Sequence, residues 1–451
     1  LPIFKNGIAD IAVGARSAVF APFENIGAII VDEEHETTYK SDMTPKYDTI
    51  EVAVKRARTC NAVAVLGSAT PSVVSMYRAK SGLYQLLTLS KRYNDNPMPK
   101  VTAVDMRSEL ERGNKSIFSA ALYEKMQSSL SGGRQTILFL NRRGYSPFIS
   151  CRKCGFVLRC AHCGLSMTWH KRADKAICHF CGASVEVTGT CPECGSPHLR
   201  HFGIGTEKVE ELTAAAFPDV RIARLDLDTS AKKDSAARIL QDFEKKKTDV
   251  LIGTQMVAKG LDFANVDLVG VIAADVSLNI PDFRSAERTF QLITQAAGRS
   301  GRGDECGEVV VQTYMPDNYA IGFAIANDYM GFYETELRFR EFMGYPPFSD
   351  VVQITAVAAS DAAAAAGAAM FRDDFLRGTV SDPDAAGNLL GPQKAAIYKL
   401  GEEYRYRLYL KVKPERRRAY EELLSELKRK INTGKNAKWR IIIDVNPFSL
   451  Q

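Results

Sequence analysis

Residues 26–35 have the sequence Ile-Gly-Ala-Ile-Ile-Val-Asp-Glu-Glu-His, a short and almost wholly apolar run that ends in three acidic residues and a histidine. Such a run is typical of a strand buried in a parallel sheet. Val63–Leu66 repeats the pattern and leads into Gly67-Ser-Ala-Thr-Pro-Ser72. Because strand-like runs alternate with helical patterns over residues 1–92, we expect a partial doubly wound α/β lobe there.

A second set of apolar runs predicts a second α/β lobe over residues 116–150 and 201–318. Its expected strands are Thr136–Leu140, Val250–Ile252, Asp267–Ile272 and Glu308–Val311. Residues 93–115 are rich in Pro, Asn, Asp and charge, so we expect a linker. Residues 319–451 show the order βαββαβ, with Ala395–Leu400 as one of the strands, and predict a C-terminal α+β domain of ferredoxin-like topology.

Eight of the ten cysteines form four Cys-x-x-Cys pairs within residues 151–200. The pairs are Cys151/Cys154, Cys160/Cys163, Cys178/Cys181 and Cys191/Cys194. One such pair can place two thiolates on a Zn²⁺ ion, and two pairs complete a Cys₄ site. We therefore expect a cysteine-rich insertion with two structural zinc ions. A disulfide framework is the alternative, but it is typical of small secreted domains. The spacing alone leaves open which pairs share a metal ion.

The composition gives weaker information. The formal net charge is +6, but eight zinc-bound thiolates would offset most of it, so any basic surface for nucleic acid must be local. No run approaches the roughly 20 apolar residues of a membrane span, and we expect no secretory leader. We expect a reduced, cytoplasmic setting and no membrane partner. The chain begins at Leu1, close to motifs that normally lie deep in a domain, and we expect it to be a fragment.

The acidic residues after the first apolar run have the chemistry that ATP hydrolysis needs. Asp32 would hold Mg²⁺, directly or through water, and Glu33 would orient and deprotonate the attacking water. An acidic loop after a strand is common, so this motif by itself is weak. The small hydroxyl residues of Gly67–Ser72 could relay between a nucleotide site and a second substrate.

Two further loops offer groups for phosphates. Residues 253–262 contain Lys259 and Gly260, which supply an ammonium group and backbone amides after a predicted strand. Arg299 and Arg302 lie three residues apart at the end of a predicted helix, where guanidinium groups can meet a γ-phosphate across a domain cleft. Motifs at the ends of successive elements, in this order, are hard to produce by chance.

The ordered motifs resemble those of the PriA family of primosomal replication-restart helicases, in helicase superfamily 2, over essentially the whole chain. They are Asp32-Glu-Glu-His35, Gly67–Ser72, Asn141-Arg-Arg-Gly-Tyr145, the eight cysteines, Gly203-Ile-Gly-Thr-Glu207, residues 253–263, Gln295–Arg302, Tyr345-Pro-Pro-Phe348 and Asp444-Val-Asn-Pro447. The resemblance implies two RecA-like lobes and a 3′→5′ DNA helicase that hydrolyses ATP with Mg²⁺ between them. It also implies that single-stranded and forked DNA, primosome proteins and single-stranded-DNA-binding protein are partners.

The resemblance assigns roles to residues of this chain. Asp32 would be the Mg²⁺ carboxylate, Glu33 the general base, Arg299 and Arg302 the arginine fingers, and Gln295 would lie near the nucleotide. The zinc arrangement would be nested. The outer ion would take Cys151, Cys154, Cys191 and Cys194, and the inner ion Cys160, Cys163, Cys178 and Cys181.

Two segments are candidates for DNA contact. Residues 38–47 are similar to the family's aromatic-rich loop, in which Tyr39 and Tyr47 could stack on unpaired bases and Lys40 and Lys46 could meet phosphates. A polar surface loop is the alternative. The predicted strand at residues 404–413 also carries two arginines that could bind DNA or be solvated on a packed sheet. They are Arg405 and Arg407.

The chain departs from the family at one point. No Gly-x-x-x-x-Gly-Lys-Ser/Thr occurs in the 451 residues, so the sequence offers no such backbone cradle for the β- and γ-phosphates. We expect that this chain alone neither hydrolyses ATP efficiently nor unwinds DNA. The alternative hypothesis is a zinc-ribbon scaffold that binds DNA or protein and has lost its motor.

Overall fold

The computed structural model describes residues 9–89, 99–140, 148–170, 175–187, 189–197, 199–202, 205–226, 229, 235–254, 263–298, 307–432 and 438–450. The chain divides into two compact units. The first unit comprises Leu1–Leu86, Phe180–Gly182 and Arg340–Gln451, and the second comprises Leu87–His179 and Ala183–Phe339. Among the described helices, none combines the length and the apolar character that a membrane crossing requires.

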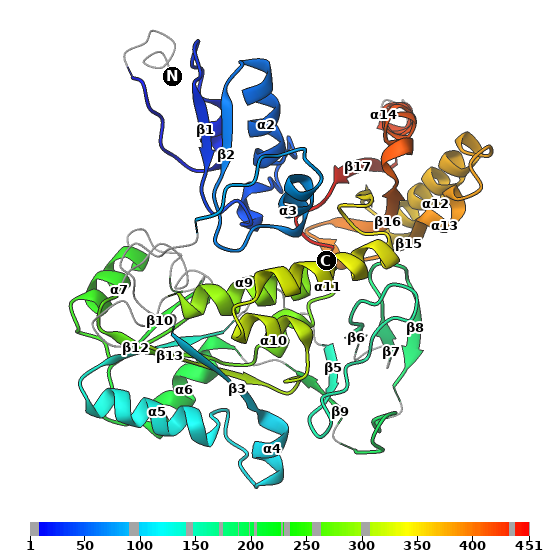
Figure 1. Cartoon of the computed structure of the whole chain (residues 1–451). Helices are drawn as coiled ribbons and strands as arrows, with labels where there is room; N and C mark the ends of the chain where they lie inside the picture. The colour runs from blue at the N-terminus through cyan, green and yellow to red at the C-terminus, as the bar shows by residue number, and fades with distance from the viewer. Residues whose placement is uncertain are drawn as a thin grey trace. The chain divides into compact units, whose positions relative to one another are not determined.

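The N-terminal part of the first unit is a small α/β layer (Figure 1). Strands β1 (Ala28–Val31) and β2 (Val63–Leu66) pair in parallel, with Val31 opposite Leu66. The remaining elements are η1 (Arg16–Phe20), η2 (Thr37–Tyr39), α2 (Thr49–Thr59) and α3 (Val73–Lys80). Each α-helix begins at a side-chain cap, because Asp48 and Ser72 accept hydrogen bonds from the first free backbone N–H groups. Both strands predicted in this part are therefore present.

The second unit contains a six-stranded parallel sheet of order β10-β11-β4-β12-β13-β3. Its strands are β3 (Lys100–Asp105), β4 (Gln135–Phe139), β10 (Ile222–Leu225), β11 (Val250–Gly253), β12 (Val266–Val271) and β13 (Glu308–Thr313). Its helices are α4 (Met106–Glu111), α5 (Ala120–Ser131), α6 (Thr206–Ala216), α7 (Ser235–Glu244), α8 (Asp275–Leu278), α9 (Ser285–Ala297), α10 (Tyr319–Ile325) and the greater part of α11 (Tyr329–Met343). The doubly wound fold predicted for this lobe is confirmed.

Part of the predicted linker belongs to this sheet instead. Residues 100–105 form β3, which pairs with β13 at the edge of the sheet, and residues 106–111 form α4. The linker prediction is therefore wrong for these residues. Polar and charged residues are frequent in an edge strand because one side of it faces solvent.

The cysteine-rich insertion lies between β4 and α6 in the chain and forms a five-stranded sheet of order β8-β7-β6-β5-β9. The strands are short and antiparallel: β5 (Phe148–Cys151), β6 (Thr168–His170), β7 (Lys175–Ile177), β8 (Ser184–Glu186) and β9 (Leu199–Phe202). Sheets this small bury little apolar surface, so they need another source of stability.

The C-terminal part of the first unit has a four-stranded antiparallel sheet of order β15-β16-β14-β17. Its elements are β14 (Asp350–Ala358), α12 (Asp361–Gly378), α13 (Ala385–Asn388), β15 (Leu389–Leu400), β16 (Glu403–Val412), η3 (Pro414–Arg416), α14 (Arg417–Asn432) and β17 (Arg440–Val445). This is the predicted ferredoxin-like βαββαβ order. Strand β15 starts six residues earlier than expected, and the compact unit begins near Arg340 rather than at residue 319.

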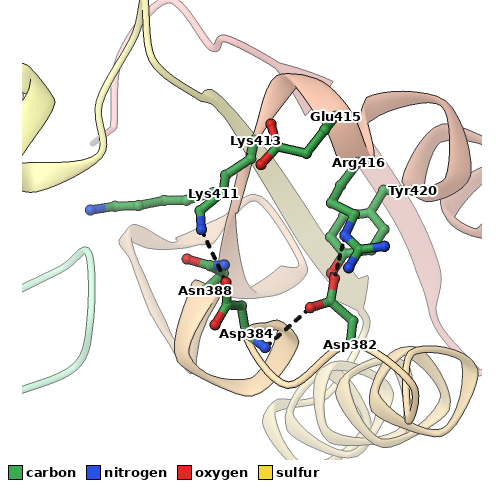
Figure 2. A pocket seen from close by; sticks show the side chains of 8 residues that line it. All are labelled: Asp382, Asp384, Asn388, Lys411, Lys413, Glu415, Arg416 and Tyr420. Atoms are coloured by element: carbon green, nitrogen blue, oxygen red, sulfur yellow. Dashed lines mark hydrogen bonds and ion pairs between the residues drawn. The ribbon is translucent and has the colours of Figure 1, made fainter.

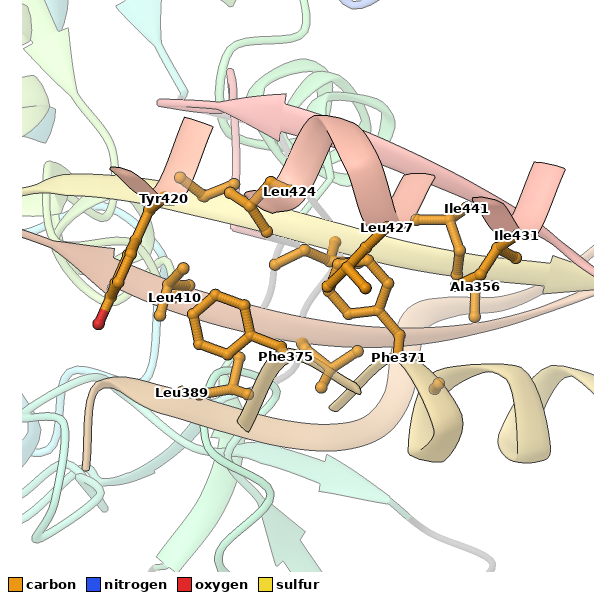
Figure 3. Close-up of a cluster of buried hydrophobic side chains, with 14 of the residues drawn as sticks. Ala356, Phe371, Phe375, Leu389, Leu410, Tyr420, Leu424, Leu427, Ile431 and Ile441 are labelled. Carbon is orange, nitrogen blue, oxygen red and sulfur yellow. The ribbon is translucent and has the colours of Figure 1, made fainter. Parts of the chain in front are cut away.

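One face of this sheet forms the core of the C-terminal domain (Figure 3). Phe371 and Phe375 of α12 and Leu424 and Leu427 of α14 pack against alternate residues of the strands, among them Leu410. The opposite face therefore presents the intervening residues of each strand.

Candidate functional site

The four residues that follow β1 divide into an exposed pair and a buried pair. Asp32 is exposed and the side chain of Glu33 is 44% exposed, whereas Glu34 and His35 are buried. The Glu33 N–H donates to Asp32 Oδ1 at 3.0 Å, and Glu33 has a left-handed φ of 47°. The Glu34 N–H donates to the Gly67 carbonyl at 3.0 Å. The turn thus holds two carboxylates at the carboxyl end of a parallel strand, where ligand sites of α/β folds lie.

The buried pair fastens this turn to the loop after β2. His35 Nδ1 lies 2.7 Å from Ser68 Oγ. The Glu34 carboxylate accepts hydrogen bonds from the Ser72 N–H at 2.6 Å and from the Ser75 hydroxyl at 2.9 Å. Glu34 therefore holds the start of α3 as well as the turn. The sequence suggested that the hydroxyl residues of Gly67–Ser72 could relay between a nucleotide site and a second substrate, but it gave Glu34 no part in holding this loop.

The loop after the acidic turn has aromatic side chains with partners inside the protein. The Tyr39 hydroxyl donates to the Asp32 carbonyl at 2.7 Å, and burial followed by the charge of Asp32 raises the pKa of Tyr39. The Tyr47 ring packs edge-on against Phe20, with centroids 4.9 Å apart. The predicted stacking of these rings on DNA bases stays a prediction.

Both lysines of this loop bind one carboxylate of β17. Lys40 Nζ lies 3.2 Å from Asp444 Oδ1 and donates to the Val445 carbonyl at 2.7 Å. Lys46 Nζ lies 2.9 Å from Asp444 Oδ2. Lys46 and Asp444 are 398 residues apart in the chain. No sequence pattern indicated this contact.

Helix α9 carries Gln295 in its last turn, and a buried ion cluster fixes its start. The fully buried Asp282 accepts hydrogen bonds from Arg284 at 2.9 Å and 3.1 Å and lies 3.3 Å from Arg288. Burial alone would raise the pKa of Asp282, but the two guanidinium groups hold it well below its usual range. Four other predicted residues lie outside the described part of the chain: Lys259, Gly260, Arg299 and Arg302.

The two predicted DNA-contacting arginines lie on the side of β16 opposite the helices. Arg405 is partly buried, and Arg407 is 9% exposed with its Nη1 3.4 Å from the Tyr409 hydroxyl. Arg407 therefore does not present its guanidinium to solvent in this structure. A DNA contact by Arg405 stays a prediction.

The eight paired cysteines form two groups of four. One contains Cys151, Cys154, Cys191 and Cys194, and the other Cys160, Cys163, Cys178 and Cys181. Within each group the ligand atoms lie within 4.8 Å of one another. This is the nested arrangement that the family resemblance implies.

The first group has the dimensions of a zinc site. The Cys151 and Cys194 sulfurs are 3.7 Å apart, and those of Cys154 and Cys191 are 3.5 Å apart. A tetrahedron with Zn–S bonds of about 2.3 Å has edges of about 3.8 Å. Burial raises the pKa of the Cys154 thiol to about 12, and a bound cation would favour its thiolate form. The residues present fit Zn²⁺.

The same backbone turn repeats at each Cys-x-x-Cys pair. The N–H groups of Cys151, Cys160, Cys178 and Cys191 each donate to the carbonyl five residues ahead, at 2.8–2.9 Å. The residue after each pair is a glycine with positive φ, from 66° to 84°. Only glycine adopts this conformation without strain. The four glycines are Gly155, Gly164, Gly182 and Gly195.

The turn at Cys151–Gly155 is packed tightly against the second lobe. A Cβ atom on Gly155 would lie 2.3 Å from the Tyr314 carbonyl oxygen. Arg107 donates to the Cys154 carbonyl at 3.4 Å and also pairs with Asp105 at 2.8 Å. The outer zinc site is therefore fixed to the end of β13, which precedes Tyr314.

The third turn, Cys178-His-Phe-Cys181, supplies an aromatic contact within the first unit. The buried Phe180 ring lies 4.7 Å from Tyr409 and 6.0 Å from Tyr345, measured between centroids. Lys411 Nζ lies 4.2 Å from the Tyr345 ring centroid, a favourable cation–π distance. Phe180 thus packs against aromatic residues of the C-terminal part of the first unit.

A polar pocket of about 180 Å³ lies in the C-terminal domain (Figure 2). Its lining consists of Asp382, Asp384, Asn388, Lys411, Lys413, Glu415, Arg416 and Tyr420. Lys413 pairs with Asp384 at 3.0 Å, and Asp382 pairs with Arg416 at 3.2 Å and accepts from the Tyr420 hydroxyl at 2.6 Å. Since these charges neutralise one another, the pocket shows no net preference for an anion or a cation.

Two α/β lobes, the first partial, and paired four-cysteine groups inserted in the second define the class as a RecA-like helicase with a zinc-binding insertion. Three family models match the chain. They are the Primosomal protein N C-terminal domain at residues 341–448, the Helicase conserved C-terminal domain at 202–304, and the PriA DNA helicase Cys-rich region domain at 160–185.

Curated relatives extend the match to nearly all of the chain. Replication restart protein PriA of Bacillus subtilis (strain 168) is 46% identical over 98% of this chain and 54% of that protein. The same protein of Haemophilus influenzae (strain ATCC 51907 / DSM 11121 / KW20 / Rd) is 37% identical over 99% of this chain and 60% of that protein. The chain belongs to the PriA family, and it spans about half the length of the curated relatives it matches.

Among solved structures, Dbp5 of S. cerevisiae bound to RNA and ADP BeF3 matches with a TM-score of 0.36 and 15% identity, over 72% of this chain and 65% of that chain. A resemblance at this level supports no conclusion.

Proposed function

We propose that the chain is the zinc-binding and C-terminal part, with much of the motor, of an ATP-dependent 3′→5′ DNA helicase that restarts replication at stalled forks. The observation that carries the proposal is the exposed pair Asp32 and Glu33 at the end of β1, fixed by Glu34 and His35 to the loop after β2. Membership of the PriA family supports the assignment to replication restart.

The chemistry follows from which groups are free to meet a substrate. Asp32 would hold Mg²⁺, which neutralises charge on the phosphates when it is bound. Glu33 is partly exposed beside it, with its Oε2 3.6 Å from His35 Nδ1, and would accept the proton of the attacking water. Glu34 and His35 are occupied within the protein, so they position the turn. Gln295, Lys259, Gly260, Arg299 and Arg302 would complete the nucleotide site from the second lobe.

The zinc-binding region and the C-terminal domain would serve DNA and protein partners rather than hydrolysis. Neither contains the acidic turn. The partners that we propose are single-stranded and forked DNA, primosome proteins and single-stranded-DNA-binding protein, in the cytoplasm. Structural zinc ions would supply the stability that the short strands of the insertion lack.

Measurements of ATP hydrolysis distinguish an active helicase from a zinc-ribbon scaffold that has lost its motor activity. We expect slow ATP turnover by the 451-residue chain, because it lacks a Gly-x-x-x-x-Gly-Lys-Ser/Thr loop. A fusion that places the preceding segment of the Bacillus subtilis relative before Leu1 is expected to show turnover stimulated by single-stranded DNA. A correctly folded fusion that binds DNA and ATP but never hydrolyses would favour the scaffold.

A further inference from the structure

The Asp444 carboxylate is enclosed by the two lysines of the loop after β1. Only 4% of its side chain is exposed, against 11% for Lys40 and 24% for Lys46. Each carboxylate oxygen has its own ammonium partner, at 3.2 Å and 2.9 Å. All three residues belong to the first unit.

This arrangement differs from an ordinary surface ion pair. A buried carboxylate is costly unless charged partners compensate for lost hydration. Here two ammonium groups converge on one carboxylate, and Lys40 also donates to the Val445 carbonyl at 2.7 Å. The loop is therefore held against β17 by specific contacts rather than by loose charge attraction.

Backbone and side-chain hydrogen bonds stabilise the loop after β1 as a hairpin, which places Lys40 and Lys46 close together. Lys40 and Asp48 form an antiparallel bridge, and the Ser41 N–H donates to the Tyr47 carbonyl at 2.8 Å. Arg16 donates to the carbonyls of Thr38 and Lys40, each at 3.2 Å. The two ammonium groups thus act as one preorganised site for an anion that offers two oxygens.

A DNA phosphodiester is such an anion, because its two non-bridging oxygens share one negative charge. We propose that Asp444 is an internal competitor for a DNA phosphate: it holds Lys40 and Lys46 in the DNA-free protein and releases them to single-stranded DNA. The inference rests on the proposed DNA-binding function and adds the residue that opposes it. Tyr39, beside Lys40, contacts the Asp32 carbonyl, so the exchange occurs next to the acidic turn.

The first test measures binding of a fluorescent (dT)₂₀ oligonucleotide to the 451-residue chain. Asp444→Asn keeps the size of the side chain and removes its charge, so we expect binding about fivefold tighter than wild type. Asp350→Asn is the matched control, because Asp350 is a mostly buried carboxylate of the same sheet that pairs with Arg417. Unchanged affinity of a folded Asp444→Asn variant would overturn the proposal.

The second test asks whether the lysines reach phosphates. For Lys40→Gln/Lys46→Gln, the slope of log affinity against log salt is expected to fall by about 0.7, since the two lysines share one phosphate and each single-strand phosphate contact contributes about 0.7. The same pair of substitutions is expected to abolish the gain of Asp444→Asn. An unchanged slope would show that the lysines stay on Asp444 in the complex and would contradict the exchange.

A third test uses the wild-type chain and does not depend on the folding of a variant. A zero-length carbodiimide cross-linker is expected to join Asp444 to Lys40 or Lys46, and saturating (dT)₂₀ is expected to reduce that yield several-fold. The pair Lys413 and Asp384, 3.0 Å apart, is the internal control. A yield that DNA leaves unchanged would refute the competition. No oligonucleotide binding by the wild-type chain at all would instead count against the proposed function.

Discussion

The Tyr39 hydroxyl donates a hydrogen bond to the backbone carbonyl of Asp32 over 2.7 Å. This contact joins the loop that carries Lys40 and Lys46 to the first carboxylate of the acidic turn. A movement of the loop therefore changes a direct partner of Asp32, without any intermediate residue.

Tyr39→Phe removes this hydrogen bond and keeps the ring. We expect a loss of about 0.5–1.5 kcal/mol in the free energy of unfolding of the first unit. Amide hydrogen exchange should become faster over residues 32–40. Tyr47→Phe is the control, because its ring contact with Phe20 does not need the hydroxyl. Equal exchange in the two variants would mean that the Tyr39 hydroxyl does not stabilise the loop.

Gly155→Ala should damage the outer zinc site more than Gly195→Ala. Both glycines follow a Cys-x-x-Cys pair of the same four-cysteine group and have positive φ, so each substitution introduces backbone strain of about 1–2 kcal/mol. Only Gly155 faces an obstacle, the Tyr314 carbonyl, whereas nothing lies within 4 Å of a Cβ on Gly195. Overpacking adds about 1–3 kcal/mol.

Zinc content and thermal unfolding measure the difference. Wild type is expected to hold two zinc ions per chain, and Gly155→Ala is expected to release its outer ion at a lower chelator concentration than Gly195→Ala. Equal zinc retention would contradict the close packing of the Gly155 turn against Tyr314.

Asp282→Asn should destabilise the second unit by about 3–5 kcal/mol, because it removes the buried carboxylate that pairs with two largely buried guanidinium groups. Asp317→Asn is the matched control: Asp317 pairs with Arg107 at 3.3 Å, but its side chain is 87% exposed. Such a pair contributes at most about 1 kcal/mol. Urea unfolding of both variants tests this, and similar losses would rule out a special role for the buried cluster.

The stability of the second unit depends on pH through Asp275. The direction of this dependence is opposite to that produced by a salt-bridged acid, because the Asp275 contribution falls as the pH rises. Burial raises its pKa to about 6, although the Thr313 hydroxyl and the Tyr314 N–H donate to it. The folded state keeps this proton up to a higher pH than the unfolded chain, whose Asp pKa is about 3.9. Its contribution to stability is therefore greatest at low pH and is lost as the pH rises through about 6.

Asp275→Asn removes that titration. Between pH 5 and pH 7.5, wild type is expected to lose about 1.4 kcal/mol of unfolding free energy relative to the variant, as the linkage relation gives for these two pKa values. Urea unfolding at several pH values measures the difference. A difference between the two proteins that stays constant over this range would show that Asp275 does not titrate there.

Much of the fold could be predicted because its signals are local. The strands of the second lobe are apolar runs, and the zinc-binding turns repeat Cys-x-x-Cys followed by glycine. Strand β3 was missed because its residues 100–105 are partly exposed and, among the described strands, pair with β13 at the edge of the sheet. An edge strand has no continuous apolar pattern that would distinguish it from a polar connection.

The parts of the site that could not be predicted depend on contacts between distant segments. Glu34 and Glu33 are adjacent and chemically alike, yet only Glu34 is buried against Ser72 and Ser75. The pairing of Lys46 with Asp444 joins residues 398 positions apart. Composition and periodicity carry no information about such pairs, because they arise from packing rather than from local structure.

The central claim is that Glu33 is the base for hydrolysis and Glu34 a positioning residue. The most direct measurement is ATP turnover, with and without single-stranded DNA, by the fusion that carries the preceding segment of the Bacillus subtilis relative. In that fusion, Glu33→Gln should lower turnover by at least about 100-fold while ATP and DNA affinities stay near wild type, and Glu36→Gln should remain active. Turnover that survives in Glu33→Gln would contradict the account.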